Sequence, residues 1–510
     1  MSPLYLTSLG SESLMFEKQG PRSQESGIPR LRLDLFTRQH LETFSVYILD
    51  HSPDSDNPII PILDNKLEFE TTTSSSSNSL PPPSGQDVDV QKYGPFCPSD
   101  KCAQGHWVPR VPRFETYEQA ENAINTAYNK NGEDRGFRMP DVELEPEPVT
   151  ITEEQRRERI LEISNWVWKP QFGEVIPFNV EEFVLKLLKS PGGMFLVGDS
   201  LTTHHFLTIF HRISQADFKL DAYAEDGPFK GHPYVVQYNL DVNHPRNQAL
   251  INMAGIPASR ASRPILTHVV AHVLTTPKEM NKIFRTDWEY VHNHHFAQVE
   301  GWQDFLAEKT RPREGEVSIT EDNLVIVNTG AHWSRSTLHG YVGKQSDRAA
   351  FSRKIEHGHS VMIKTMIASM ASLSQTTVFF RSTSPGHSSC MQHYRPFSSI
   401  EAAKDFTEKP ENNKETTEQW WDWDMFASRN EMWRAEIKKY EEERNANNWN
   451  GKGSKWVYLD FWQMDLQRAD AHSGYWDCLH YIVPFEFKEW TDMIFHYLFV
   501  EERLKERQPH

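Results

Sequence analysis

The sequence predicts an α/β fold, a three-layer sandwich built around a central and mostly parallel sheet. Three short runs are almost continuously apolar, and they lie at residues 194–197, 324–327 and 377–380. Continuous apolar character is typical of strands that are buried on both faces of a parallel sheet. Amphipathic helical patterns lie before and between these runs, at residues 180–188, 201–213 and 347–373. This alternation of strands and helices places functional sites at the carboxyl ends of the strands.

The chain divides into an N-terminal segment and one folded domain. Residues 1–92 are expected to be disordered or loosely packed, because residues 71–79 are almost pure Thr and Ser and a Leu-Pro-Pro-Pro-Ser stretch follows at 80–84. Such a composition buries too little apolar surface to offset the entropy lost on ordering. Aromatic and apolar residues are frequent from residue 93 to about 505, which we assign to a single domain.

Residues 403–455 look like an insertion in that domain. They contain Trp420, Trp421, Trp423 and Trp433, followed by a charged, helix-like run at 434–444. The tryptophans suit either a lid over a substrate cleft or a helical hairpin that packs on the core. The hairpin is the favoured interpretation.

Charge and hydropathy exclude several classes of partner. A net charge of −17 over 510 residues would repel nucleic acid and anionic membrane surfaces, so neither is expected as the main partner. The most apolar stretches fall well short of the ~20 residues that a membrane span needs, so no transmembrane helix is predicted. Residues 1–30 contain no apolar segment typical of secretory signals. Three alternatives follow: a cytosolic location, export by another route, or an anchor that this sequence lacks.

The residues that follow the first apolar run suit a nucleophile. The run ends at Gly198, the chain turns through Asp199 and Ser200, and a helix is predicted from about Leu201. Glycine permits the tight turn. The free N–H groups and the dipole at a helix start would favour an oxyanion that develops beside Ser200. The alternative is that Ser200 is only an N-cap residue.

A second motif, Asp477-Cys478-Leu479-His480, supplies the partners that a serine nucleophile needs. A general base must take the proton of the serine, and a carboxylate must hold the imidazole in the right tautomer. An aspartate three residues before a histidine can place both side chains on one turn. We therefore predict a triad of Ser200, His480 and Asp477. An unrelated surface aspartate and histidine are the alternative.

Two other clusters are weaker candidates. His292, His294 and His295 include two adjacent histidines and lack an HExxH-type pattern around them, so no metal site is predicted. Asp422 and Asp424 are the residue type of a glycosidase pair. Their tryptophan neighbours favour instead an amphipathic surface that both aspartates decorate.

Seven motifs, each weak alone, together resemble the trichome birefringence-like / PC-esterase family of the broader GDSL (SGNH) hydrolase-like superfamily. They stand in the order of that family and cover most of residues 107–500. The motifs are GHWV at 105–108, WVWKP at 166–170, FLVGDSL at 195–201, VIVNTG at 325–330 followed by HW at 332–333, FFRSTSPGH at 379–387, RADAHS at 468–473 and DCLH at 477–480.

The resemblance implies an SGNH-hydrolase-like fold and assigns roles to matching residues. Ser200 would be the nucleophile, His480 the general base and Asp477 its partner. Asn328 corresponds to the oxyanion-side asparagine of the family, and Gly330 would let substrate approach the same loop.

Other matching positions carry less definite roles. Gly198 belongs to the nucleophile motif and is assigned with Asn328 to the oxyanion side. Arg381, Arg468 and Asp470 match family positions that have no assignable catalytic role. They are interpreted as supports of the site or as substrate contacts, with a buried structural ion pair as the alternative.

The implied activity is serine-dependent O-acyl transfer, with acetyl groups passed to glycan hydroxyls through an acyl-enzyme. A carbohydrate acetylesterase would use the same triad with water in place of the sugar, and a non-catalytic glycan-binding relative also stays open. No tightly bound cofactor is expected. An acetyl donor such as acetyl-CoA would be a co-substrate, and a polysaccharide would be the partner. The resemblance implies the Golgi or secretory pathway, against the cytosolic location above.

The chain also departs from the family. Members often continue the nucleophile motif with Arg and then Gln or Asn-Gln, where this chain has Thr-Thr-His-His at 202–205. We therefore expect the acyl acceptor or the rate to differ. Plant relatives carry a disulfide at positions that correspond to Cys390 and Cys478, which implies the same bridge here. Cys97 and Cys102 would then pair locally or stay free, and four free thiols in a reducing compartment are the alternative.

Overall fold

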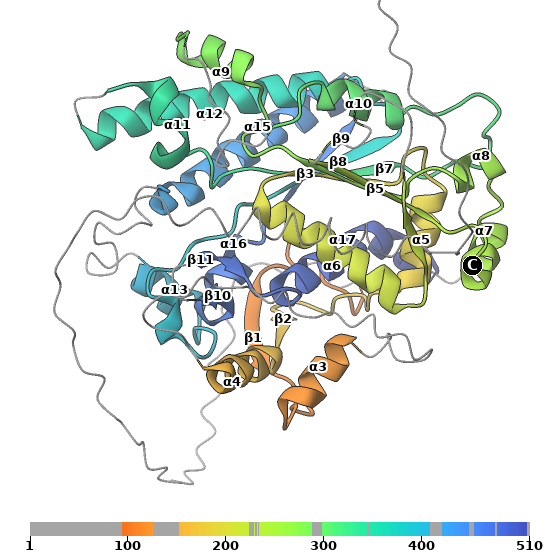
Figure 1. Cartoon of the computed structure of the whole chain (residues 1–510), viewed down its shortest axis with the longest axis horizontal. Helices are drawn as coiled ribbons and strands as arrows, with labels where there is room; N and C mark the ends of the chain where they lie inside the picture. The colour runs from red at the N-terminus through yellow and green to blue at the C-terminus, as the bar shows by residue number, and fades with distance from the viewer. Residues whose placement is uncertain are drawn as a thin grey trace, which may run out of the picture. The chain divides into compact units, whose positions relative to one another are not determined.

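Seven strands form a central sheet in the order β4-β5-β6-β3-β7-β8-β9 in this computed structural model (Figure 1). The five parallel strands are β6 (Leu266–Val270), β3 (Met194–Gly198), β7 (Asn323–Asn328), β8 (Thr376–Arg381) and β9 (Lys455–Leu459). β5 (Val235–Leu240) lies antiparallel to β6, and β4 (Leu220–Ala222) lies antiparallel to β5. The α/β class and the mostly parallel sheet are therefore confirmed.

The structure describes most of the chain after residue 93. The described residues are 94–125, 152–223, 229, 232, 234–287, 298–344, 347–407, 421–447, 453–474 and 477–506. They all belong to one compact unit, Ser55–His510. The expectation for residues 1–92 lies outside them. No helix in these ranges is long and apolar enough to cross a membrane.

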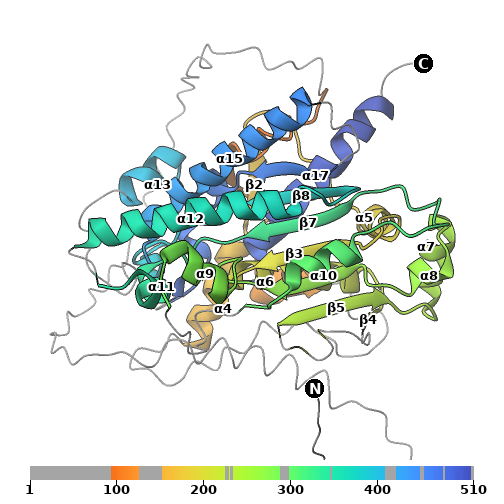
Figure 2. The same ribbon diagram turned by 90° about the horizontal axis from the view of Figure 1, so that it is seen from above.

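Helices cover both faces of the sheet, which gives three layers (Figure 1). One face carries α9 (Pro277–Phe284), α10 (Trp302–Lys309), α11 (Arg335–Val342), α12 (Arg348–Met370) and α15 (Phe426–Ala446). The opposite face carries α5 (Val180–Leu188), α6 (Ser200–Gln215) and α17 (Phe485–Glu506). Figure 2 shows α12 running in nearly the same direction as β7 and β8.

The two helical layers explain why the strands have continuous apolar runs. Successive side chains of a strand point to opposite faces. Leu196 therefore packs in the core on the side of α6 and α17, and Val197 packs in the core on the side of α12 and α15. Both side chains are fully buried. Each strand needs apolar residues at every position because it has no solvent-facing side.

Smaller elements surround the sheet. β1 (Gly105–Pro109) pairs with β2 (Trp166–Pro170), and β10 (His472–Gly474) pairs with β11 (Asp477–Tyr481), both antiparallel. The remaining helices are α3 (Tyr117–Asn125), α4 (Glu153–Ser164), α7 (Pro245–Ala254), α8 (Ala258–Ala261), α13 (Ile400–Thr407) and α16 (Trp462–Leu466), with 3-10 turns η4 (Cys390–Gln392), η6 (Trp423–Met425) and η7 (Ala469–Ala471).

The predicted strands and helices are all present. The three apolar runs are β3, β7 and β8, and the three amphipathic patterns are α5, α6 and α12. The sequence did not predict β6 and β9. β6 reads Leu-Thr-His-Val-Val, so polar residues interrupt its apolar run, and β9 begins at the end of the segment interpreted as an insertion.

The segment 403–455 supplies the crossover from β8 to β9. α15 packs against the sheet through Trp433, which is fully buried and stacks on Phe380 with 4.1 Å between ring centroids. Trp421 and Trp423 lie at the start of this crossover and are only half-buried. Of the four tryptophans, Trp433 therefore packs on the core as predicted. Trp420 lies outside the described residues.

Candidate active site

The strand order brings the site to the middle of the sheet. β3 comes first along the chain among the parallel strands, yet it lies between β6 and β7. The chain therefore moves to one side of β3 and later returns to its other side. In open α/β sheets, ligands bind outside the carboxyl ends of the strands at such a switch point. Ser200 follows β3 at this position.

Asp199 and Gly198 fix Ser200 at the start of α6. The Asp199 carboxylate caps the helix and accepts a hydrogen bond from the N–H of Leu201 at 3.1 Å. A Cβ atom at Gly198 would lie 2.3 Å from the carbonyl oxygen of Asn328, so only glycine lets β3 and β7 approach here. Ser200 is 5% exposed and is the first residue of the helix, where backbone N–H groups have no partner within the helix.

The structure brings the three predicted triad residues together. His480 Nε2 lies 2.6 Å from Ser200 Oγ, and His480 Nδ1 lies 2.8 Å from Asp477 Oδ2. These distances suit hydrogen bonds from the serine hydroxyl to the imidazole and from the imidazole to the carboxylate. The imidazole can therefore take a proton from Ser200 while Asp477 holds the ring.

The pair Asp477 and His480 lies on β11 rather than on a helical turn. Asp477 Oδ1 accepts hydrogen bonds from the backbone N–H groups of Leu479 and His480, at 3.3 and 3.0 Å, and this folds the aspartate side chain back along its own strand. Cys478, between the two, is bonded to Cys390 with 5.5 Å between their Cα atoms. This disulfide is the one that the resemblance implies.

Opposite charges shift the titration of the pair. Burial raises the pKa of Asp477, but the adjacent His480 outweighs it and holds the pKa well below its usual range. Burial lowers the pKa of His480, whereas Asp477 and then Asp199 raise it, and the net result lies above the ordinary value. Asp477 is thus an anion at every ordinary pH, and it favours the protonated imidazole that forms during catalysis.

Asn328 and Gly330 lie at the end of β7, next to the nucleophile motif. Asn328 is fully buried, and its Nδ2 donates hydrogen bonds to the carbonyl oxygen of Arg381 at 2.9 Å and to Thr383 Oγ1 at 3.3 Å. Donation to an oxyanion would require one of these bonds to break, so that role stays a prediction. A Cβ atom at Gly330 would lie 2.2 Å from Thr383 Oγ1, which makes close packing a sufficient reason for glycine there.

The two predicted arginines are both buried. Arg468 pairs with Asp470 at 2.9 Å and with Glu486 at 3.0 Å, and all three side chains are at most 1% exposed. This is the buried ion pair that the sequence left as an alternative. Arg381 is fully buried at the end of β8, with its guanidinium 4.0 Å above the ring of Trp490.

His204 contacts the catalytic imidazole; the sequence singled it out only as one of the four residues at 202–205 that depart from the family, and did not predict this contact. Its ring packs edge-on against His480 at 5.3 Å and against Phe487 at 5.6 Å. Burial, and then the neighbouring His480, lower the pKa of His204 to about 3, so this second imidazole is neutral. Its position four residues after Ser200 on one helix was the available signal, because such residues share a face.

The prediction that both aspartates of the Trp-rich segment decorate a surface was wrong for Asp422. Asp422 is fully buried and accepts hydrogen bonds from the backbone N–H of Arg335 at 2.8 Å and from its Nε at 2.7 Å. It thereby anchors the segment to the start of α11. Its half-buried neighbour Trp423 packs against a small apolar cluster that includes Leu479, the residue before His480. Burial of an ionised carboxylate requires such partners, and the sequence alone does not reveal them.

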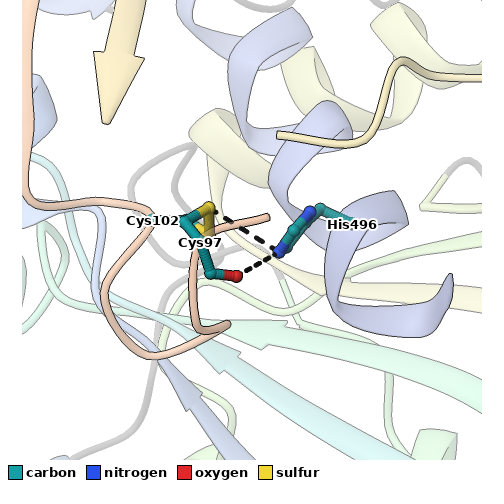
Figure 3. Close-up of side chains that lie close together, drawn as sticks. All are labelled: Cys97, Cys102 and His496. Atoms are coloured by element: carbon teal, nitrogen blue, oxygen red, sulfur yellow. Dashed lines mark hydrogen bonds between the residues drawn. A yellow bond between two sulfur atoms is a disulfide. The ribbon is translucent and has the colours of Figure 1, made fainter. Parts of the chain in front are cut away.

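One cluster has the residue types of a metal site, but its sulfur and nitrogen atoms are already bonded to other protein groups. Cys97, Cys102 and His496 lie together, and the two cysteines form a disulfide (Figure 3). The N–H of Ile176 donates to His496 Nδ1 at 3.0 Å, so the imidazole proton is on Nε2, which donates to the carbonyl oxygen of Cys97 at 2.9 Å. The cluster ties the first described residues to α17. His292, His294 and His295 lie outside the described residues.

Comparisons with known proteins add no name to this geometry. No protein-family model and no curated protein matches the chain.

Proposed function

We propose that this protein is a serine-dependent O-acyltransferase that passes acetyl groups to glycan hydroxyls through an acyl-enzyme. The observation that carries the proposal is the hydrogen-bonded series from Ser200 Oγ through His480 to Asp477. Support for the glycan acceptor comes from the resemblance of the seven motifs to the trichome birefringence-like / PC-esterase family. The same resemblance supports an SGNH-hydrolase-like arrangement of the observed α/β sheet.

The first half-reaction forms the acyl-enzyme. Ser200 Oγ attacks the carbonyl carbon of the acetyl donor while His480 Nε2 takes the hydroxyl proton. The carbonyl electrons move to oxygen, where the N–H groups at the start of α6 can stabilise the charge. When the intermediate collapses, the bond to the donor breaks and His480 gives its proton to the leaving group. Asp477 stays ionised throughout and stabilises the imidazolium.

The second half-reaction transfers the acetyl group. A sugar hydroxyl attacks the ester carbonyl of the acyl-enzyme, and His480 removes its proton. The bond to Ser200 Oγ then breaks, and the serine oxygen takes the proton back from His480. The products are an acetylated sugar and the free enzyme, so no oxidant or further reactant is required.

Acetyl ester hydrolysis is a second candidate, and one observation favours it. The side chains of His480 and Asp477 are 23% and 29% exposed, so water can approach the general base. Water in place of the sugar hydroxyl would turn the second half-reaction into hydrolysis. Transfer requires that the bound acceptor exclude this water.

Matched assays separate the two activities. The purified chain is incubated with isotope-labelled acetyl donor and a panel of glycans, and in parallel with acetylated glycans. The proposal expects label in the glycan and a labelled Ser200 ester, both lost in Ser200→Ala and kept in Ser214→Ala at the other end of α6. Release of acetate without label in any glycan would replace transferase by esterase. Activity that survives Ser200→Ala would reject both.

A further inference from the structure

Two buried histidines lie beside the hairpin that carries the catalytic base. His387 follows β8 in the segment that leads to Cys390, and His472 is the first residue of β10. Both side chains are fully buried, and His387 Nδ1 lies 2.7 Å from His472 Nε2. Two ring nitrogens at this distance share one proton in a hydrogen bond, because two lone pairs so close would repel each other. These two residues, the histidine pair, take no part in the acyl-transfer steps.

The histidine pair connects α16 to both strands of the hairpin. His387 Nε2 lies 2.9 Å from the carbonyl oxygen of Leu466, at the end of α16. The backbone N–H of His387 donates to the carbonyl oxygen of Cys478 on β11 at 2.9 Å. His472 on β10 reaches β11 as well, because its Nδ1 lies 3.3 Å from the carbonyl oxygen of His480. The pair therefore touches the backbone of the base itself.

His472 also packs against the residue that follows the base. Its ring stacks on that of Tyr481 with 4.4 Å between the ring centroids and 11° between the planes, and the two residues are partners in the register of β10 and β11. The Tyr481 hydroxyl donates to the carbonyl oxygen of Asp465 on α16 at 3.3 Å. A shift of His472 would therefore displace both the carbonyl group of His480 and the ring of Tyr481.

The positions of the protons in the histidine pair follow from its acceptors. The carbonyl oxygen of Leu466 can only accept, so His387 carries its proton on Nε2. Neutral His387 then accepts at Nδ1, and His472 must donate from Nε2. This leaves His472 Nδ1 without a proton in the longest of the three contacts, 3.3 Å from the His480 carbonyl oxygen. The reverse assignment would place a lone pair only 2.9 Å from the Leu466 oxygen.

Burial supports the neutral state of both rings. It lowers the pKa of His387 to about 4 and the pKa of His472 well below the ordinary range. For His472, the neighbouring His387 acts in the same direction as burial, and Asp477 opposes both. The histidine pair therefore holds two protons for its three contacts at any pH where a neutral His480 can act as a base.

We propose that His387 and His472 are positioning residues for the triad: as a neutral pair, with each ring protonated on Nε2 alone, they hold the hairpin β10–β11 so that His480 stays within reach of Ser200. The proposal rests on the proposed function in taking His480 as the general base. The pair supplements the disulfide at Cys478, because it adds a connection from the hairpin to α16.

The first test determines the tautomers of the unmodified protein. In the full chain with 15N-labelled histidine, the 15N shifts at about pH 7 distinguish protonated from unprotonated ring nitrogens. Each ring is assigned from the signals that disappear in its own variant. We expect His387 and His472 to be protonated on Nε2 alone. A His472 ring that is protonated on Nδ1, or on both nitrogens, would overturn the proposal.

The second test determines whether the histidine pair positions the triad. His472→Met removes the donor, whereas His472→Gln keeps an N–H that can donate to His387. The readouts are the low-field proton resonance between His480 and Asp477, which needs no turnover, and the rate at which an activated acetyl ester labels Ser200. We expect His472→Met to weaken the resonance and to slow labelling roughly tenfold, because small displacements of a base are costly. The half-saturating ester concentration should change little, and His472→Gln should restore most of the rate.

His359→Met is the matched control for the loss of a buried imidazole. His359 is also fully buried and accepts a hydrogen bond from Trp433 Nε1 at 3.2 Å, but it lies on α12, on the opposite face of the sheet from α6. The variant should lower the thermal midpoint and leave the low-field resonance and the labelling rate unchanged. Equal losses in His359→Met and His472→Met would overturn the proposal, as would an unchanged resonance and rate in His472→Met.

Two further outcomes have a defined meaning. If His472→Met does not fold, the tautomers of the wild type decide the proposal by themselves. If Ser200 takes no acetyl group while the tautomers and the low-field resonance are as expected, the result counts against the proposed function and leaves the role of the histidine pair standing.

Discussion

The nucleophile and the base are held in different ways. Ser200 is the first residue of α6, just beyond the carboxyl end of β3, the middle strand of the main sheet, and is 5% exposed. Asp477 and His480 lie on β11, which within the described part of the chain pairs with the three-residue strand β10 alone, outside that sheet, and their side chains are 23–29% exposed. A disulfide to Cys390 holds the strand that carries them.

The nucleophile and the base are therefore held in position by two different kinds of contact. Around Ser200, backbone packing is so close that Gly198 has no room for a Cβ atom, and the helix cap is local. Around His480, the position depends on single contacts: the Asp477 carboxylate, the Ser200 hydroxyl and the disulfide beside them. We therefore expect the base to be the part of the site that is easier to displace.

The largest loss of activity is expected when either the nucleophile or the base is removed. Ser200→Ala and His480→Ala should each lower the rate of acyl transfer by roughly 10³-fold or more, because they act as one unit. The double variant should be little worse than either single one. Rates are measured with an activated acetyl ester, and Ser214→Ala is the control. Losses that multiply in the double variant would show that the two residues act independently.

The second prediction concerns the disulfide between Cys390 and Cys478, which holds the strand that carries His480. Cys390→Ser with Cys478→Ser should lower kcat by about tenfold or more, because a 1 Å displacement of a catalytic group is costly. The stability loss should be roughly 2–4 kcal/mol. Cys97→Ser with Cys102→Ser removes the other disulfide, which is also buried but encloses a sequence separation of 5 rather than 88.

This second pair is the matched control for the disulfide between Cys390 and Cys478. It should reduce the thermal midpoint and leave kcat nearly unchanged, because Cys97 contacts His496 of α17 and the bond does not hold the strand that carries His480. Equal losses of kcat in both double variants, measured well below their unfolding temperatures, would mean that the disulfide beside His480 does nothing specific for the base.

The surroundings of Ser200 could be predicted from the sequence more fully than those of His480. The apolar runs and the Gly-Asp-Ser turn are local signals, so the strands β3, β7 and β8 and the position of Ser200 followed directly. The role of the Asp-x-x-His motif was predicted from its chemistry, but its placement on a strand was not. Its geometry depends on Asp477 bonding to its own backbone and on a bridge to a residue 88 positions away.

Burial of charge was the main feature that the sequence did not reveal. Asp422 was expected on a surface, yet Arg335 pairs with it inside the fold. Arg381 was singled out only by resemblance, and its neighbours Asp199 and Asp465 come from different segments. Such clusters form only when distant elements meet, so no local pattern indicates them.

The smallest effect concerns Asp465, which lies where the two regions meet. Its carboxylate contacts Ser384 and Trp490, and its carbonyl oxygen accepts a hydrogen bond from the hydroxyl of Tyr481 at the end of β11. Burial raises the pKa of Asp465 to about 7, against the opposing hydrogen bonds from Ser384 and Trp490. The folded protein therefore binds a proton that the unfolded chain has already released between about pH 4 and pH 7.

The Asp465 carboxyl group consequently lowers the free energy of unfolding as the pH rises through that window, and the loss is complete above about pH 7. Asp465→Asn keeps an acceptor for the indole of Trp490 and removes the charge. Relative to the wild type, the variant should gain roughly 1–3 kcal/mol between pH 5 and pH 8, measured by denaturant unfolding at both values. Asp405→Asn, an exposed carboxylate on α13, should show no such difference. If the variant is destabilised equally at both pH values, Asp465 contributes through its hydrogen bonds alone, and its carboxyl group does not titrate between pH 5 and pH 8.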